Sequence, residues 1–439
     1  MVAGALFPHA PVLVPEVGRG EEERVGQTRA ALDRMVADLL SLFPQQAVLV
    51  SPHGPHFPGK TAFPHKDPLE GDLAYFRAPG SRVSLPLATA LLSALEEEAR
   101  DTGLDLLPLP GEELEYASVV PLLFLVRGGG ALPLLVLWPS LDRERLFELG
   151  GAVARAAERT GKRTAVLISG DLSHRLKPDA PAGYHPRARL FDREVTRALE
   201  RGEAEALMAL DEELRELAGE DVLHALPVML GALEGWEVEP KLYSYQAPYG
   251  VGYAVALWTA RQPREESELV RLARRILHLR LGEGKTEEEI LSLLRRELQP
   301  LPPALSREAG CFVSLKRRGK LRGCMGSLAP RNLLENLVSS ALNAAEEDYR
   351  FPPVGPEELD LLTVTVDVLG AFEPVNSKED LDPREYGILV IQGQKRALLL
   401  PDLPGIETPE EQLQAVLRKA GLPPDARPEI YRFRTERHR

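Results

Sequence analysis

The sequence predicts an α/β N-terminal domain followed by a second, α+β domain. The chain has 439 residues, which is too long for one ordinary domain. Short apolar runs alternate with helical patterns as far as residue 258, and this alternation is typical of a sheet layered with helices. After a polar, proline-containing segment at residues 259–267, the best linker candidate, helical patterns come first and strand-like runs follow. We therefore expect one domain at residues 1–262 and another at residues 263–439.

Three short runs in the first domain are typical of buried strands. They are rich in Val, Leu, Ile and Ala and lie at residues 47–51, 132–138 and 164–169. Helical patterns accompany them at residues 22–42, 142–159 and 186–201. A last strand or a hairpin, turned at Pro248-Tyr-Gly250, is expected at residues 243–258. This order predicts a sheet with helices packed against it.

The second domain begins with two helical patterns, at residues 268–280 and 286–298. Prolines end the second pattern, because proline lacks the N–H donor that a helix interior needs. Strand-like runs follow at residues 311–315, 362–368 and 387–391. A helix is expected between the first two runs, at residues 332–347. Helices and strands in this order predict an α+β domain.

The composition excludes several classes of protein. The formal net charge is −13, and a field of that sign repels phosphate backbones, so general nucleic-acid binding is not expected. Every long apolar run is interrupted by proline, glycine or charge, so no membrane span is expected. The first residues lack the basic region of a signal peptide, and two cysteines cannot form a disulfide framework. We expect a cytoplasmic protein.

The histidines are concentrated in the first domain, where seven of the nine precede residue 230. His53 and His174 each follow a predicted strand directly, and ligands of α/β sheets bind beyond the carboxyl ends of strands. Prolines stiffen the backbone beside His9 and His53. Two imidazoles and one carboxylate, from the segment that holds Glu220 and Asp221, would form a facial triad that suits Fe(II). His56 is a further candidate, either as a residue that hydrogen-bonds a metal ligand or as one that contacts substrate.

Four segments of the first domain resemble the class III extradiol dioxygenase B-subunit superfamily, which includes the Memo-like proteins. They are Pro8–Pro15, Ser51–Pro55, Ser169–Arg175 and Ala247–Tyr253. The resemblance implies an Fe(II)-dependent ring-cleavage fold.

The resemblance also implies roles for single residues. His9 and His53 match the two histidine ligands, Glu220 the carboxylate ligand and His174 the catalytic histidine. Asp221 and His224 are alternatives to Glu220, and zinc or copper are alternatives to Fe(II). From its place before His174, Asp171 is expected to accept hydrogen bonds that fix this loop.

The segment Leu321-Arg-Gly-Cys-Met-Gly-Ser-Leu328 distinguishes the second domain. Gly323 and Gly326 indicate unusual backbone angles or a close approach of chains. Arg322 would lower the pKa of the Cys324 thiol and make it reactive, or bind an anion with the N–H groups of a glycine-rich turn. The other interpretation is that Cys324 is a small buried side chain and Arg322 an ion-pair partner.

This segment resembles the AMMECR1 family, with Met325 in place of an isoleucine, and the likeness extends over residues 266–439. It implies a surface patch around Arg322, Gly323, Cys324 and Gly326 for nucleotide or partner binding. The two domains together resemble the fused protein A of the AmmeMemoRadiSam system, which accompanies a radical S-adenosylmethionine protein. Two cysteines cannot supply the cluster that radical chemistry needs, so that enzyme would be a separate partner.

Two functions are consistent with these patterns. The first is an Fe(II)-dependent extradiol-type dioxygenase that acts on a small, catechol-like aromatic substrate. The second is a metal- or ligand-binding accessory protein without turnover, working with the radical S-adenosylmethionine partner. Extradiol relatives often pair, which favours a homodimer in either case.

Overall fold

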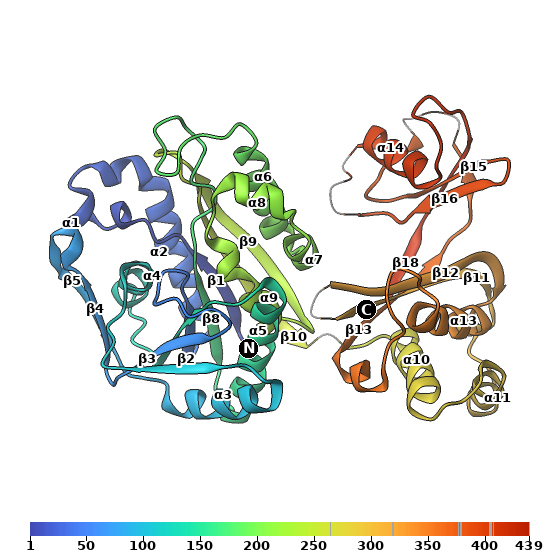
Figure 1. The fold of residues 1–439 in the computed structure, drawn as a ribbon, viewed down its shortest axis with the longest axis horizontal. Helices are drawn as coiled ribbons and strands as arrows, with labels where there is room; N and C mark the ends of the chain where they lie inside the picture. Colours follow the sequence, from blue (N-terminus) through green and yellow to red (C-terminus); the bar gives the residue numbers. More distant parts are fainter. Residues whose placement is uncertain are drawn as a thin grey trace. The chain divides into compact units, whose positions relative to one another are not determined.

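A computed structural model describes residues 1–263, 265–317, 320–375, 377, 380–403, 406 and 408–438. The chain divides into two compact units, Met1–Arg264 and Glu265–Arg439. Each unit encloses a hydrophobic core of its own, so we describe them separately (Figure 1).

An eight-stranded mixed sheet forms the centre of the first unit. Its strand order is β6-β3-β7-β2-β8-β1-β10-β9. The bounds are β6 (Leu106–Pro110), β3 (Thr61–His65), β7 (Leu134–Pro139), β2 (Gln46–Val50), β8 (Thr164–Ser169), β1 (Ala3–Phe7), β10 (Tyr253–Pro263) and β9 (Trp236–Gln246). Strands β7, β2, β8 and β1 run parallel, and every residue in them is buried, which explains their continuous apolar sequences.

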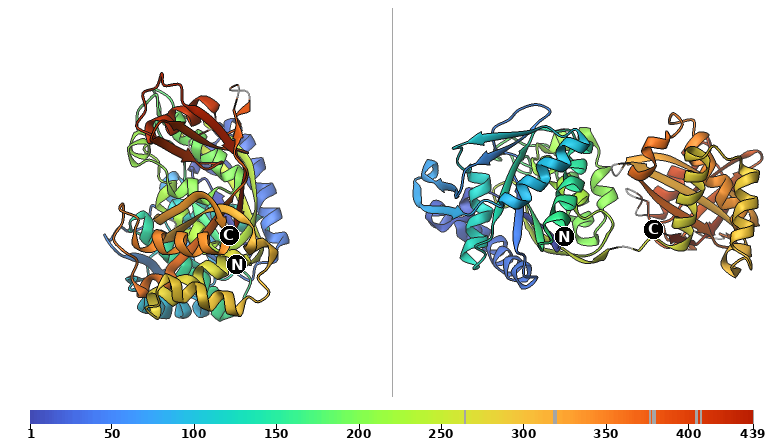
Figure 2. Two further views of the ribbon diagram at one scale, coloured as in Figure 1. Left: turned by 90° about the vertical axis from the view of Figure 1, so that its right-hand side faces the viewer. Right: turned by 90° about the horizontal axis from the view of Figure 1, so that it is seen from below.

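Helices cover both faces of this sheet (Figures 1 and 2). On one face α3 (Thr89–Thr102), α5 (Arg143–Thr160) and α9 (Leu226–Ala232) pack together, and on the other lie α2 (Gly26–Ser41) and α4 (Tyr116–Arg127). The remaining helices are η1 (Pro11–Leu13), α1 (Pro15–Gly18), η2 (Glu21–Val25), η3 (Ala74–Phe76), α6 (Ala188–Arg201), α7 (Ala204–Met208), α8 (Glu212–Ala218) and η4 (Val222–His224). A separate two-stranded arm consists of β4 (Leu69–Leu73) and β5 (Ala78–Leu85).

Two antiparallel four-stranded sheets form the second unit. The first contains β12 (Lys320–Asn332), β11 (Glu308–Arg317), β13 (Leu362–Leu369) and β18 (Thr435–His438), and the second β14 (Glu373–Pro374), β17 (Glu429–Phe433), β15 (Gly387–Gln392) and β16 (Lys395–Leu399). The helices are α10 (Glu268–Leu277), η5 (His278–Gly282), α11 (Glu287–Glu297), α12 (Pro303–Ser306), α13 (Leu333–Glu346), η6 (Pro356–Leu361) and α14 (Pro409–Lys419). Helix α13 packs on β11 and β12, and α14 on β15 and β16.

The predicted fold classes, an α/β first domain and an α+β second domain, are confirmed. The predicted linker at residues 259–267 is wrong in its first part, because β10 continues to Pro263. Thr259 pairs with Ala3 on one side and with Glu239 on the other, so these polar residues lie in the sheet. Residue 264 lies outside the described residues. In the part of the chain that the structure describes, we find no helix long and apolar enough to cross a membrane.

Candidate metal centre

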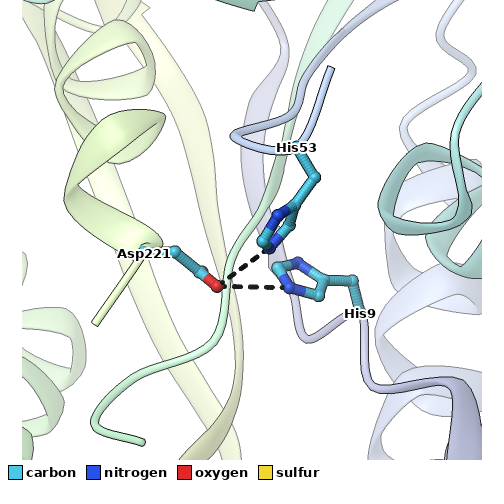
Figure 3. Close-up of side chains that lie close together, drawn as sticks. All are labelled: His9, His53 and Asp221. Atoms are coloured by element: carbon cyan, nitrogen blue, oxygen red, sulfur yellow. Dashed lines mark hydrogen bonds and ion pairs between the residues drawn. The ribbon is translucent and has the colours of Figure 1, made fainter. Parts of the chain in front are cut away.

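Two histidines and one carboxylate meet in the first unit: His9, His53 and Asp221 (Figure 3). Asp221 Oδ2 lies 3.3 Å from His9 Nε2 and 3.2 Å from His53 Nε2. One ligand atom from each of the three residues falls within 4.8 Å of the others. Two imidazole nitrogens and a carboxylate oxygen at such distances are a donor set that binds divalent transition metals.

Three neighbouring strands bring these groups together. His9 follows β1, His53 follows β2, and β8 lies between these two strands and leads to His174. The carboxyl ends of these parallel strands therefore deliver three histidines to one edge of the sheet. Asp221 comes from the turn before η4, and its Oδ1 accepts a hydrogen bond of 2.7 Å from the Asp171 N–H. This bond leaves Oδ2 facing the histidines.

A hydrogen bond orients the buried His9 ring. The Ser169 hydroxyl donates to the Ala117 carbonyl at 2.6 Å, so it can only accept from His9 Nδ1, which lies 3.0 Å away. His9 Nδ1 thus carries a proton, and Nε2 is the nitrogen that faces Asp221. Fixing the ring through its other nitrogen is the usual arrangement of metal-binding histidines.

His174 lies at the border of the cluster. Its Nε2 is 3.7 Å from Asp221 Oδ2, and its side chain is partly accessible. Among the described residues, none hydrogen-bonds its buried Nδ1. Its backbone N–H donates to the Ala218 carbonyl at 3.1 Å, which fixes the loop after β8. The ring thus stands beside the three clustered ligands, with Nε2 towards Asp221 and Nδ1 buried.

Opposite charges compensate each other in this buried site. Burial alone would lower the pKa of His9, but Asp171 and Asp221 raise it to about 9. Burial would raise the pKa of Asp221, yet His9, His53 and His174 hold it well below its usual range. A divalent cation among these groups would play the same compensating part as the proton on His9.

Glu220, the carboxylate that the resemblance implied as a ligand, points elsewhere. Its fully buried side chain forms an ion pair with Arg215, and its Oε2 accepts a 2.7 Å hydrogen bond from the Leu223 N–H. Burial raises the pKa of Glu220 to about 7. His224, the other alternative, contacts Arg215 at 3.0 Å through Nε2. The structure therefore places the adjacent Asp221, and neither Glu220 nor His224, between the two histidines.

Asp171 and His56, which were expected to support the metal ligands or contact substrate, have different positions. Asp171 Oδ1 accepts a 3.1 Å hydrogen bond from the His9 N–H, so it fixes the first ligand loop as well as the turn around Asp221. His56 Nδ1 is 2.8 Å from Ser140 Oγ and is not a member of the ligand cluster.

Sequence reasoning missed a carboxylate that joins two loops of the site. Glu115 accepts hydrogen bonds from Ser51 Oγ at 2.7 Å, Ser118 Oγ at 2.5 Å and the Ala117 N–H at 2.5 Å. It caps the N-terminus of α4 while holding the residue two positions before His53. Glutamate is not among the residues preferred at an N-cap, so its position before an apolar helix gave no signal of this role.

Glycine is required directly after His53. A Cβ atom on Gly54 would lie 1.9 Å from the ring of Trp138, a fully buried residue of β7. The loop therefore rests directly on the hydrophobic core, which leaves His53 little freedom to move.

In the second unit, the segment from Arg322 to Gly326 lies within strand β12 and not in a glycine-rich turn. Its two glycines allow close approaches: a Cβ on Gly323 would lie 2.0 Å from the Ala344 carbonyl, and one on Gly326 would lie 2.3 Å from the Cys311 carbonyl. The first contact lets α13 pack directly on the strand. The expected close approach is thus found, and the expected anion-binding turn is wrong.

Internal partners occupy Arg322. Its guanidinium contacts both oxygens of Glu358, at 2.8 and 3.0 Å, and donates to the carbonyls of Pro352 and Pro353. These contacts favour the interpretation of Arg322 as an ion-pair partner. Cys324 is partly exposed; its Sγ accepts from Ser314 Oγ at 3.2 Å.

Comparison with known proteins agrees with this division of the chain. Residues 3–256 match the family of the catalytic LigB subunit of aromatic ring-opening dioxygenase, and residues 270–438 match AMMECR1. The chain belongs to the LigB family and carries an AMMECR1 domain. The predicted combination of these two domains is thereby confirmed.

A relative from Clostridium acetobutylicum matches this chain over almost the whole length of both proteins. It is 33% identical over 466 residues, which cover 99% of this chain and 98% of the relative. A Thermotoga maritima protein is 49% identical over 137 residues, which cover 30% of this chain and 79% of that protein. The crystal structure of an uncharacterized Pyrococcus horikoshii protein matches with 34% identity and a TM-score of 0.34, covering 38% of this chain and 88% of that one.

Proposed function

We propose that the LigB-type unit is a metal-dependent extradiol-type dioxygenase that acts on a small catechol-like substrate. The observation that supports this is the cluster of His9 Nε2, His53 Nε2 and Asp221 Oδ2 at the carboxyl edge of the sheet. These three residues would hold Fe(II), with zinc or copper as the other metals that imidazole and carboxylate ligands accept. Asp221 takes the place first assigned to Glu220.

Iron suits the reaction because three protein ligands leave further coordination positions open. When bound, Fe(II) supplies a centre at which a catecholate and O₂ are brought together. In the overall reaction, a carbon–carbon bond next to the diol breaks and both atoms of O₂ enter the product.

The chain itself orients the ligands and moves protons. The Ser169 hydroxyl fixes the His9 ring, and Asp171 fixes both the His9 loop and Asp221. His174, whose partly accessible ring lies beside the ligand cluster, would take a proton from a substrate hydroxyl and return it to the ring-opened product. His174 is therefore assigned as the general acid–base group.

Metal affinity tests the ligand assignment. We expect anaerobically prepared protein to bind about one Fe(II) per chain, and His9→Ala or Asp221→Ala to weaken binding at least about 100-fold because a ligand is lost. Glu220→Gln is the matched control, since the amide keeps the buried shape, and we expect binding within about threefold of wild type. Metal content after dialysis against graded chelator measures this. Loss in Glu220→Gln with retention in Asp221→Ala would restore Glu220 as the ligand.

Turnover tests the reaction. Fe(II)-loaded protein with a panel of catechols and O₂ should give yellow ring-opened products with matching oxygen uptake. His174→Gln should keep the iron while lowering kcat about 10²- to 10⁴-fold, the usual contribution of a general acid–base group. Equal kcat values for His174→Gln and wild type would remove His174 from this role.

The accessory role is the second candidate. The observation that favours it is that Asp221, and not the glutamate that the resemblance implied, lies with the two histidines. The AMMECR1 domain would then contact a separate radical S-adenosylmethionine protein or a second copy of the chain. Full iron occupancy without turnover on any catechol would support this candidate over the first.

A further inference from the structure

A second group of reactive side chains surrounds Cys324 in the second unit. Cys324 lies on β12, directly opposite Ser314 of β11 in the antiparallel ladder. Its N–H donates to Asp348 Oδ2 at 2.8 Å, and its carbonyl accepts from Arg350 at 3.2 Å, so both backbone groups point away from β11. Opposite residues that exchange no ladder hydrogen bonds have their side chains especially close together. The Ser314 hydroxyl accordingly donates to Cys324 Sγ at 3.2 Å.

The Cys324 side chain lies on the face of its sheet that is turned away from α13. Gly323, the residue before it, packs on α13, and side chains alternate between the two faces along a strand. On the face of Cys324, Phe312 lies two residues before Ser314 in β11 and packs in an apolar cluster with Leu389 of β15. The thiol is therefore on the face that meets the second sheet of this unit, and it is partly exposed there.

Two arginines near Cys324 are already neutralised. Arg350 forms an ion pair of 2.6 Å with Asp348, whose side chain is buried. Arg322, two residues before Cys324 in β12, forms an ion pair of 2.8 Å with Glu358. Each of these positive charges has a carboxylate at contact distance, so neither pair gives the surroundings of the thiol a net charge. The pairs instead hold the backbone around Cys324 in place.

A third cation, Lys419 at the end of α14, has no such carboxylate. Its side chain is accessible to solvent, but partial burial lowers its pKa. Cys324 raises the pKa of Lys419 and Arg350 lowers it, so both groups lie close enough to act on its charge. Among the described residues, no carboxyl group contributes to this pKa. Lys419 therefore gives the surroundings of Cys324 a net positive charge.

This combination of groups is suited to one kind of ligand. A sulfur that accepts a hydrogen bond is stabilised as the thiolate, which is the nucleophilic form of cysteine. A neighbouring ammonium group attracts carboxylates. The whole chain, with a formal net charge of −13, repels anions, so the attraction of a carboxylate to Cys324 depends on Lys419.

We propose that Cys324 is the nucleophile of a second reactive site, which takes a small aldehyde that bears a carboxylate, with Lys419 attracting that carboxylate. Cys324 Sγ forms a bond with the aldehyde carbon, and the π electron pair of the C=O bond moves to the oxygen. This oxygen takes up the proton that the thiol releases, so the product is a hemithioacetal. No group leaves and nothing is oxidised, so the step needs no co-reactant. The inference is independent of the function proposed for the metal centre.

Two alkylating reagents test the positive charge beside the thiol. Iodoacetate and iodoacetamide differ mainly in charge, and peptide mass spectrometry of the full-length chain gives the labelling rate of Cys324 with each. We expect the ratio of the iodoacetate rate to the iodoacetamide rate to be at least about fivefold higher in folded protein than in the same protein unfolded in urea. Lys419→Gln should abolish this excess. The matched control is Arg418→Gln, which removes an exposed positive charge from the preceding residue of α14 and should retain the excess.

Two further measurements test the nucleophile and the substrate class. Ser314→Ala should slow labelling of Cys324 by iodoacetamide about threefold and leave the reagent ratio unchanged, because it removes a hydrogen bond and no charge. Glyoxylate, an aldehyde that bears a carboxylate, should protect Cys324 from iodoacetamide at least about fivefold more strongly than acetaldehyde at the same concentration.

Each part of the inference has its own contrary result. Labelling of Cys324 as slow as that of the buried Cys311 would overturn its role as a nucleophile. Equal reagent ratios in folded and unfolded protein, or an excess that survives Lys419→Gln, would overturn the carboxylate subsite. Equal protection by the two aldehydes would overturn the substrate class. None of these results depends on iron, so they leave the metal centre untouched.

Discussion

The metal centre of the first unit and the Arg322–Gly326 segment of the second unit both stand out in the sequence, but they use their polar groups differently. In the first, three ligand atoms converge, and the buried His174 Nδ1 lacks a partner among the described residues. In the second, Arg322 uses its donors on Glu358 and two carbonyls. Ligand atoms that converge on one point indicate a binding site, whereas donors that are all paired within the protein indicate a structural contact.

The pKa values of buried carboxyl groups also differ between the two units. Burial raises the pKa of Asp192 to about 6 and that of Glu220 to about 7 in the first unit. Hydrogen bonds from Arg322 lower the pKa of Glu358 to about 2, and those from Arg350 lower the pKa of Asp348 to about 2. Burial therefore dominates the pKa of Asp192 and Glu220 in the first unit, although histidines hold that of Asp221 low, whereas hydrogen bonds from arginine dominate at the two carboxyls of the second unit.

Replacing Arg322 should have the largest effect on stability. Arg322→Ala removes the hydrogen bonds to Glu358, Pro352 and Pro353 and leaves Arg317, 2.9 Å away, as the remaining partner of Glu358, so we expect a loss of about 3 kcal/mol in the free energy of unfolding. Arg331→Ala, which removes an exposed arginine of the same strand, should change it by less than about 0.5 kcal/mol. Urea unfolding measures both. A stable Arg322→Ala protein would break the comparison, because Arg322 would then be free for a ligand.

A smaller loss is expected from Gly323→Ala. Its methyl group would meet the Ala344 carbonyl, and separating β12 from α13 should cost about 2 kcal/mol. Gly282→Ala is the control in the same unit, since nothing lies within 4 Å of its added methyl group. Thermal unfolding of both variants would show the difference. An equal effect at both positions would contradict the close approach at Gly323.

Acid should weaken the second unit through Glu358. The pKa of this carboxyl is lowered from its ordinary 4.5 to about 2, so its stabilising effect is complete above pH 4.5 and is lost as the pH falls towards 2. Glu358→Gln should therefore be less stable than wild type at pH 7, and the gap should narrow by pH 2.5. Unfolding temperatures across this range test it, and a constant gap would contradict the charge pairing.

The smallest effect concerns the two thiols, which differ in labelling rate rather than stability. Cys311 is fully buried and its pKa is raised to about 11 by burial, whereas Cys324 is partly exposed. Iodoacetamide should label Cys324 at least about tenfold faster than Cys311, as followed by peptide mass spectrometry. Equal, slow labelling of both would place Cys324 in the core.

Sequence reasoning found the parts of the site that continuous apolar strands define. Strands β2, β7 and β8 were expected because a strand buried on both faces needs uninterrupted apolar residues. His53 and His174 could be placed at one edge because each directly follows such a strand. The strands β3 and β6 were missed, since the prolines within them argue against a strand.

The choice between Glu220 and Asp221 depends on tertiary contacts. Adjacent side chains at the end of a helix point in different directions. Here Gly219, with a φ of 62°, ends α8 and turns the backbone just before Glu220 and Asp221. Arg215 attracts Glu220, and the Asp171 N–H attracts Asp221. In β12, glycines that indicated a turn instead serve close packing against α13, which one sequence cannot distinguish.

The position of β1 in the sheet has a consequence for synthesis on the ribosome. This strand precedes both of its partners in the chain, since it pairs with β8 and β10, so that Phe7 meets Ser169 and Ala3 meets Thr259. His9 therefore follows a strand that has both of its neighbours only after β10, which ends at Pro263, has been synthesised. Before that point, one edge of β1 presents unpaired backbone groups to other strands.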